Sequence, residues 1–232
     1  MRPDGPPSLI ESALKLATRL EHRGLREVAL LAWGRGRELM SSSEKLTFLW
    51  VTPAPGSPEP DGLRVRRADP ADGPRYAADI GTDSASTFRR RLSRTTSCFV
   101  AELNGRLVHA SWVTTSGAWT RELQLYVVPP RGGDDGGGEA YVYESFTRAE
   151  ARGKGAYPKV LRHIESWAAA SGLTRLWVAV ESSNSPSLRA IAKAGYSAGF
   201  ELAFERRLGR LSRSDPEGPL AAVGRRMLVE RA

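Results

Sequence analysis

The residues best suited to chemistry are two glycines and two cations in one short loop, Arg152-Gly-Lys-Gly155. This loop follows an apolar stretch typical of a strand, residues 141–147, and precedes a stretch with helical spacing of its apolar residues. A strand that ends in a loop and opens a helix presents unpaired backbone N–H groups, and the helix dipole adds partial positive charge. Arg152 and Lys154 supply mobile positive charge at the same place, so we predict that the loop binds a phosphate or pyrophosphate.

Two common phosphate-binding motifs do not fit this loop. A P-loop needs four residues between its glycines followed by Lys-Ser/Thr, which the chain lacks here. A dinucleotide fingerprint needs a third glycine where this chain has Pro158, a residue that suits the first turn of a helix. Taken alone, the loop is equally compatible with a glycine-rich surface turn.

A second segment downstream strengthens the functional interpretation. Residues 176–181 are typical of a buried strand, and Asn184 then suits a helix N-cap, with Pro186 in the first turn and Gly195 at the end. An extended pattern resumes over 196–206. The C-terminal half is thus predicted as strand, loop, helix, strand, Asn-capped helix, strand.

These two segments resemble the GNAT superfamily of acyl-CoA N-acyltransferases. The pyrophosphate loop of that family reads Arg/Gln-x-x-Gly-x-Gly/Ala, and this chain fills it with Arg152, Gly155 and Tyr157, departing at the last place. The second family motif has an Asn, an Ala or Ser three residues on, and Gly-Phe/Tyr after seven more. Every fixed position of it is matched, by Asn184, Ser187, Gly195 and Tyr196. The resemblance extends from about residue 63 to about residue 207.

The resemblance implies an α/β (α+β) fold with a mixed, largely antiparallel central sheet and helices on both faces. It implies an enzyme that moves an acyl group, acetyl above all, from acyl-CoA to a primary amine by direct attack on the thioester. Acetyl-CoA or another acyl-CoA would be the co-substrate, with no metal. The residues that would bind it are Phe146, Thr147, Arg152, Gly153, Lys154, Gly155, Ala156, Tyr157, Asn184 and Ser187. Phe146 and Thr147 would act through backbone atoms.

The attacking amine must lose a proton, so a carboxylate or a water chain is needed. Glu144 is interior to an otherwise apolar run, where an unpaired carboxylate would be costly, and it is the candidate catalytic residue. The alternative is a structural salt bridge to an arginine. Glu139 and Glu181 are weaker candidates, because a solvated carboxylate is ordinary near a strand end.

The departing thiolate could take a proton from a tyrosine. Many family members have one seven residues after the motif Asn, but this chain has Ile191 there. Tyr157 and Tyr196 are nearby alternatives, the second better explained as a core residue. His109, on a predicted hairpin strand, could face the acceptor cleft.

The elements around these segments divide the chain into four parts. We expect an N-terminal helical extension (1–51), a proline-rich linker (52–62), the acyltransferase domain (63–210) and a loose C-terminal tail (211–232) with a short helix near 220–229. Residues 63–67 and 122–128 are predicted strands, and 98–103 and 106–113 a hairpin around Asn104-Gly105, which favours a type I′ turn.

The charge and composition of the chain limit the partners that it could bind. The 232-residue chain carries a net charge of +8 and has a pI near 10.0, which suits CoA, nucleic acid, an anionic membrane surface or a lipid-linked substrate. Most of the excess is dispersed arginine, so a solvated surface also explains it, although residues 88–94 form a basic cluster. No nucleic-acid-binding motif is present, which disfavours nucleic acid. The expected partner is a small-molecule or peptide amine acceptor, with a homodimer through the N-terminal helices as an option.

The cysteine content and the lack of long apolar runs indicate where the protein is located. The single Cys98 excludes an internal disulfide and a cysteine-based zinc site. No apolar run approaches the ~18–20 residues that span a bilayer, and no signal-peptide pattern opens the chain, so we expect a cytoplasmic protein. The alternatives are a catalytically silent acyl-CoA sensor, and an acyltransferase whose donor is a longer acyl-CoA or an acyl carrier protein.

Overall fold

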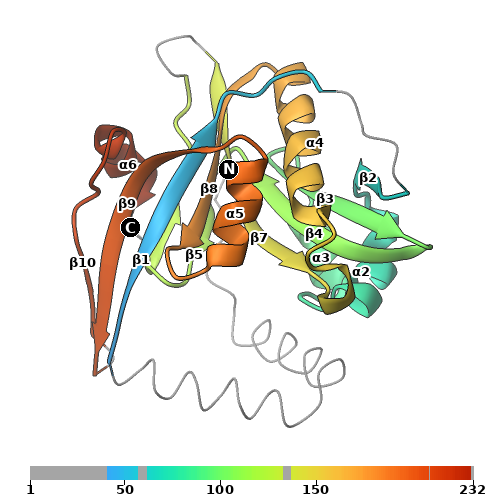
Figure 1. Cartoon of the computed structure of the whole chain (residues 1–232), viewed down its shortest axis with the longest axis horizontal. Helices are drawn as coiled ribbons and strands as arrows, with labels where there is room; N and C mark the ends of the chain where they lie inside the picture. Colours follow the sequence, from blue (N-terminus) through green and yellow to red (C-terminus); the bar gives the residue numbers. More distant parts are fainter. Residues whose placement is uncertain (1–40, 57–61, 133–136, 209, 231–232) are drawn as a thin grey trace.

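The computed structural model describes residues 41–56, 62–132, 137–208 and 210–230. The main sheet contains β1 (Ser41–Val51), β2 (Arg64–Arg67), β3 (Thr96–Leu103), β4 (Arg106–Thr114), β7 (Gly138–Thr147), β8 (Leu173–Glu181), β9 (Ser197–Arg207) and β10 (Arg210–Arg213). Their order is β10-β9-β1-β8-β7-β4-β3-β2 (Figure 1). Every neighbouring pair is antiparallel except β7 and β8, which are parallel. The predicted mixed, largely antiparallel sheet is confirmed.

Helices cover both faces of this sheet, as predicted. The helices are α2 (Gly73–Asp79), α3 (Ala85–Arg91), α4 (Ala156–Ala170), α5 (Ser185–Lys193) and α6 (Ala221–Met227), with short 3-10 turns η1 (Pro70–Asp72) and η2 (Ala149–Ala151). Helices α4 and α5 pack on one face, the near side in Figure 1. Helices α2, α3 and α6 pack on the other, beside a small sheet of β5 (Ala118–Thr120), β6 (Leu125–Val127) and β11 (Leu228–Val229). No helix in the described ranges has the length and apolar character to span a membrane.

Strand β1 corrects the expected N-terminal helical extension. Residues 41–51 do not extend a helical region; they run between β8 and β9 and pair antiparallel with both. Phe48 lies opposite Phe200 on β9, and its ring stacks on that ring at 4.3 Å between centroids. The chain adopts a strand here because residues 46–51 send alternate apolar side chains into the two cores. Residues 1–40, with the rest of the predicted extension, lie outside the described residues, as do residues 57–61 of the predicted linker.

The C-terminal tail is also more ordered than predicted. Strand β10 pairs with β9, and Glu217 forms a β-bridge with Glu201. The expected short helix is α6, and its Met227 is fully buried in the core beneath the sheet. The segment from 211 to 229 is therefore part of the packed body.

Several other elements were predicted correctly from short stretches of sequence. Asn104 and Gly105 have φ values of 50° and 77°, the two positive values that a type I′ turn requires, so the predicted hairpin turn is confirmed. The predicted strand at 122–128 is shorter, because only residues 125–127 pair, within β6. Helix α4 buries a stripe at helical spacing, consisting of Val160, Leu161, Ile164 and Ala168.

Candidate active site

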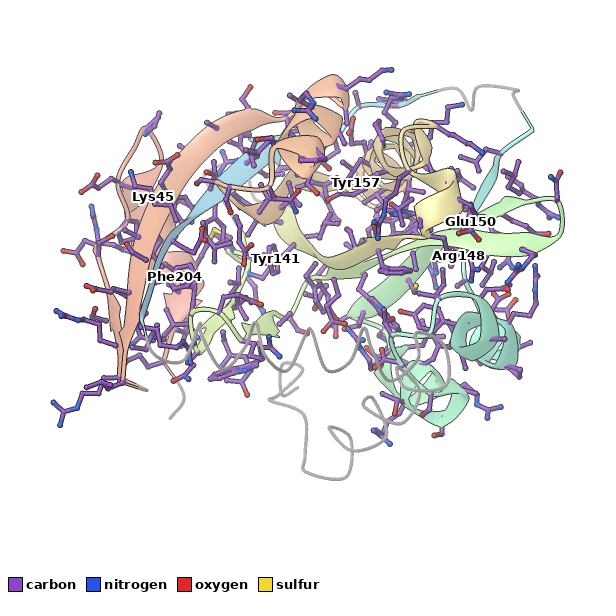
Figure 2. All side chains as sticks on the ribbon, turned by 60° about the horizontal axis from the view of Figure 1, so that its bottom comes forward. Lys45, Tyr141, Arg148, Glu150, Tyr157 and Phe204 are labelled. Carbon is purple, nitrogen blue, oxygen red and sulfur yellow. The ribbon has the colours of Figure 1, made fainter. Side chains whose placement is uncertain are left out.

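A cleft opens where the two parallel strands separate. Strands β7 and β8 pair as far as Val142 and Val178, and no further β7–β8 pair is described. Beyond that point β8 continues beside β1, while β7 continues beside β4. Residues 143–147 therefore present one backbone edge to the gap, which is part of a cavity of about 1470 Å³. Tyr141 from β7 and Tyr157 from the start of α4 both line it (Figure 2).

A β-bulge lies on this open edge. Trp112 pairs with Tyr143 and Ala110 with Phe146, so the single residue Ser111 faces both Glu144 and Ser145. Glu144 has φ 46°, a left-handed conformation that is uncommon for a residue with a side chain. The bulge turns the Glu144 side chain outward, and it is 48% exposed. Glu144 was expected to be buried because it is interior to an otherwise apolar run, and its side chain is instead exposed because the bulge breaks the alternation of the strand.

An arginine holds Glu144 at the cavity wall. Arg91 Nη1 lies 2.7 Å from Glu144 Oε2, and it also pairs with the fully buried Asp83. The guanidinium lies 4.0 Å from the centre of the Trp112 ring. Burial alone would lower the pKa of Arg91, but Glu144, Asp83 and nearby tyrosines raise it well above its ordinary value. The salt bridge considered as the alternative for Glu144 is present, and it orients the carboxylate beside the cavity.

The predicted phosphate loop forms the other end of the cavity. Gly153 and Gly155 have φ values of 74° and 76°, and a Cβ added to either would meet no close neighbour. Because α4 begins at Ala156, its first N–H groups have no partner within the helix. Arg152 Nε donates to the carbonyl of Thr147 at 3.2 Å, which ties the loop to the end of β7.

The cavity brings the predicted residues together. Those that line it are Glu144, Phe146, Thr147, Arg152, Gly153, Gly155, Ala156, Tyr157, Asn184 and Ser187. Lys154 instead lines an adjoining hollow of about 670 Å³, with Lys159, Arg162 and Lys193. The loop thus has open N–H groups on one side and four cations on the other.

The second motif opens helix α5 as predicted. Asn184 is the N-cap, and its Oδ1 accepts the N–H of Ser187 at 3.2 Å. Pro186 lies in the first turn. Ile191, at the place where many family members have a tyrosine, is fully buried in the core between the sheet and the helices. A proton donor for the cavity must therefore come from another position.

His109 is part of the cavity wall. It is fully buried, with Nδ1 2.6 Å from Thr147 Oγ1 and Nε2 2.8 Å from Ser111 Oγ. The Tyr157 ring stacks on the imidazole at 5.1 Å, with 26° between the planes. Burial lowers the pKa of His109 to about 3, so the ring is neutral. It does not present a nitrogen to an acceptor directly.

The other two candidate carboxylates and the second candidate tyrosine lie in different environments. Glu139 is 4% exposed, accepts from Trp177 Nε1 at 2.5 Å and pairs with Arg175 at 3.1 Å. It is a buried structural carboxylate, which corrects the expectation of a solvated one. Glu181 lines the cavity, and Tyr196 is buried in the core. Within the described ranges, no three or more His, Cys, Asp or Glu side chains are grouped to hold a metal ion.

The cavity continues past the bulge into a region that the sequence did not indicate. Its walls there come from α3, from the segment before it, and from β5 and the turn after it; they include Thr82, Thr87, Arg90, Trp119, Arg121 and Glu122. These residues come from short helices and turns without a shared motif, so no local pattern links them. They leave room for a second molecule beside the Glu144 carboxylate.

The sheet and this cleft define an α/β protein whose cavity opens between two separating parallel strands, beside a glycine-rich helix start. The sequence model of the acetyltransferase (GNAT) family matches residues 66–196, more than half of the chain. The chain therefore belongs to the GNAT family of acetyltransferases, whose co-substrate is acetyl-CoA. Strands β1 and β9 lie outside the matched residues.

Solved structures share this fold at low sequence identity. A putative GNAT acetyltransferase from Novosphingobium aromaticivorans has a TM-score of 0.50 and 17% identity, over 75% of this chain and 66% of its own. A GCN5-related N-acetyltransferase from Sphaerobacter thermophilus has a TM-score of 0.50 and 14% identity, over 77% and 57%. An aminoglycoside acetyltransferase from an uncultured soil metagenomic sample has a TM-score of 0.47 and 13% identity, over 57% and 87%. No curated protein matches the chain significantly in sequence.

Proposed function

We propose that the protein is an acyl-CoA-dependent N-acyltransferase that transfers acetyl from acetyl-CoA to a primary amine by direct attack on the thioester. The observation that carries this proposal is one cavity that joins the glycine loop to the open edge of β7. A phosphate group held by the loop places an extended arm along that edge. The arm then ends at the bulge, beside the Glu144 carboxylate.

The loop is suited to the pyrophosphate of CoA. The first N–H groups of α4 and the loop glycines bind its oxygens, and the helix dipole favours the negative charge. Further cations surround the adjoining hollow, namely Lys154, Lys159, Arg162 and Lys193. Asn184 and Ser187, at the start of α5, flank the pantetheine arm on the β8 side of the cavity.

The open edge of β7 supplies the chemistry at the thioester. Backbone N–H groups of residues 143–147 on the β8 side stabilise the oxyanion that develops on the thioester carbonyl. Glu144 accepts the proton that the incoming ammonium must lose, directly or through water. The region from α3 to the turn after β5 holds the rest of the acceptor, a small molecule or a peptide amine.

Replacing Gly155 with glutamate is expected to abolish binding of acetyl-CoA. The new side chain would project from a left-handed residue into the phosphate site and bring negative charge to it. Thermal unfolding checks this, because a ligand that binds only the native state raises Tm. Saturating acetyl-CoA should raise Tm of the natural protein and leave that of Gly155→Glu unchanged.

Gly172→Glu is the matched control. Gly172 follows the other end of α4, has φ 70°, and is equally open around its Cα. Both variants bear a similar backbone cost of about 1–2 kcal/mol, but Gly172→Glu should keep the full rise with acetyl-CoA. An absent rise in the natural protein with acetyl-CoA, longer acyl-CoAs and free CoA would overturn the proposed function. A rise without release of CoA on any amine would identify a silent acyl-CoA sensor.

Glu144→Gln is expected to lower kcat for acetyl transfer by about 10²-fold or more, since a positioned general base contributes about 10²–10⁴-fold. The assay is release of CoA thiol from acetyl-CoA with whichever amine is most active in a panel of amino sugars, polyamines and peptides. Glu150→Gln is the control: that carboxylate is similarly exposed, at 54%, and likewise pairs with an arginine, Arg148. Equal activity of the two variants would remove Glu144 from the mechanism.

A further inference from the structure

A turn of the small sheet carries a carboxylate into the cavity beyond the bulge. The turn covers residues 121–124 between β5 and β6, and both Arg121 and Glu122 on it line the cavity. Glu122 is half-buried, whereas Arg121 is exposed. Within the described residues Glu122 forms no ion pair, although arginines line the same region. A half-buried carboxylate that no described arginine neutralises is suited to a positive charge on a ligand.

The backbone on both sides of Glu122 is anchored. On one side, Thr120 pairs with Leu125 across the small sheet. On the other side, Leu123 is fully buried in the core, and its carbonyl accepts a hydrogen bond from Arg213 Nη1 at 2.8 Å. The Glu122 carboxylate is therefore held at the cavity wall before a ligand binds, which lowers the cost of ordering it.

Tyr141 links Glu122 to the carboxylate at the bulge. Burial raises the pKa of Tyr141 above its ordinary value, against a hydrogen bond with Thr120 that lowers it. The negative charges of Glu122 and Glu144 raise this pKa further, so both carboxylates act on the Tyr141 hydroxyl. The Tyr141 ring stacks on the Tyr143 ring at 5.9 Å between centroids, and both line the cavity. Since the face of an aromatic ring attracts cations, this wall offers rings and carboxylates to one ligand.

The arginines of this region favour the opposite charge on the acceptor. Arg91 pairs with the buried Asp83 and with the proposed base, so its charge is already compensated. Arg90 and Arg121 also line the cavity and would suit a carboxylate or a phosphate. Both are exposed, so water and salt screen their charges more than the charge of the half-buried Glu122. The negative faces of the aromatic rings also disfavour an anion.

We propose that Glu122 determines acceptor specificity by binding a second ammonium group, so that the acceptor is a diamine or another amine with two positive charges. This inference rests on the proposed function. One amine lies at Glu144, where it loses its proton and attacks the thioester, and the other keeps its charge beside Glu122 and the Tyr141 ring. The net charge of +8 on the chain repels dications in general, so a preference for them has to come from the site itself.

Calorimetry of amines binding to the complex of the protein with CoA tests this without turnover. The probes are linear diamines of three to six carbons, each compared with the monoamine and the ω-amino acid of the same length. These three compounds end in an ammonium, a methyl group and a carboxylate. The natural protein should bind the best diamine about tenfold or more tightly than its monoamine, the value of a hydrogen bond to a charged group. The ω-amino acid should bind no better than the monoamine.

Variants of Glu122 assign the preference to this residue. Glu122→Gln should bind the diamine and the monoamine equally, and should bind CoA like the natural protein. Glu122→Lys should prefer the ω-amino acid. Glu205→Gln is the matched control, because it removes the same charge from a half-buried glutamate of β9 that is not part of the cavity lining, and it should keep the preference for the diamine.

The inference fails if the natural protein binds the diamine no better than the monoamine, or if it prefers the ω-amino acid. It fails equally if Glu122→Gln keeps the preference for the diamine, or if the CoA complex binds none of these amines. Absence of CoA binding would instead overturn the proposed function itself.

Discussion

Phe48→Ala will lower the free energy of unfolding by about 3–5 kcal/mol, the usual cost of removing a buried phenylalanine ring. Phe48 is fully buried, and its ring stacks on Phe200 of the neighbouring strand. For a chain of this size, Tm should fall by about 2–4 °C for each kcal/mol lost. Calorimetry and denaturant titration of the full chain give both quantities.

Lys45→Ala is the control on the same strand. Its side chain is 59% exposed and faces Glu201 at 3.7 Å, so the loss should stay within about 1 kcal/mol. Deleting residues 1–51 is the extreme case, because it removes the partner of both β8 and β9. A cooperative unfolding transition in that deletion, or a small effect of Phe48→Ala, would show that β1 is dispensable and that the expected boundary at 51 was correct.

Arg91→Met will destabilise the protein by about 3–5 kcal/mol, because it leaves the buried Asp83 carboxylate without the arginine that pairs with it. It also removes the group that orients Glu144, so transfer activity should fall with stability. Adding Asp83→Asn should restore part of the stability, since the buried charge that Arg91 neutralised is gone, but none of the activity. Urea titration and the CoA-release assay separate the two effects.

Arg106→Met is the control for Arg91. Its side chain is 59% exposed and pairs with Asp79 at 3.1 Å. A change of about 1 kcal/mol or less is expected at such an exposed pair. If Arg91→Met were as mild, or if Asp83→Asn made the loss larger, the buried pair would not be the source of the stability.

The parts of the fold that were predictable from sequence depend on local signals. The capped helix at Asn184, the proline after the glycine loop and the Asn104-Gly105 turn are each written in a few adjacent residues. The predicted site residues also line the cavity, with the single exception of Lys154. These features could be predicted because adjacent residues in the sequence determine the backbone conformation at caps and turns.

The missed features depend on residues far apart in the chain. Thr47 of β1 hydrogen-bonds Ser182, 135 positions away, so no local pattern identifies its partner. The apolar run at 46–51, followed by prolines, is nevertheless a strand signal that a stricter count of period and length could have found. The strands beside β7 determine the bulge at Glu144 and the burial of Glu139. The sequence therefore predicted a buried Glu144 and a solvated Glu139, the reverse of what the structure has.

The hydrogen bonds around His109 show a further limit. Its partners are ordinary serine and threonine side chains, and only the register of β4 against β7 brings Thr147, Ser111 and Ser145 together beside it. The bulge has a part in this, because it places Ser145 opposite Ser111 and turns Glu144 away. A single extra residue in one strand thus separates the Glu144 carboxylate from the Ser145 hydroxyl, which contacts Ser111.

The position of β1 has a consequence for synthesis of the protein. A ribosome makes this strand before any other strand of the sheet, yet its neighbours β8 and β9 end only at residues 181 and 207. Until β8 emerges, β1 has no partner, and until β9 emerges, β1 keeps one unpaired edge. The pairing of β1 with β8 and β9 joins residues that are far apart in the sequence. Closing the sheet is therefore a slow, late step of folding. The nascent protein is therefore exposed to misassociation until β9 has been made.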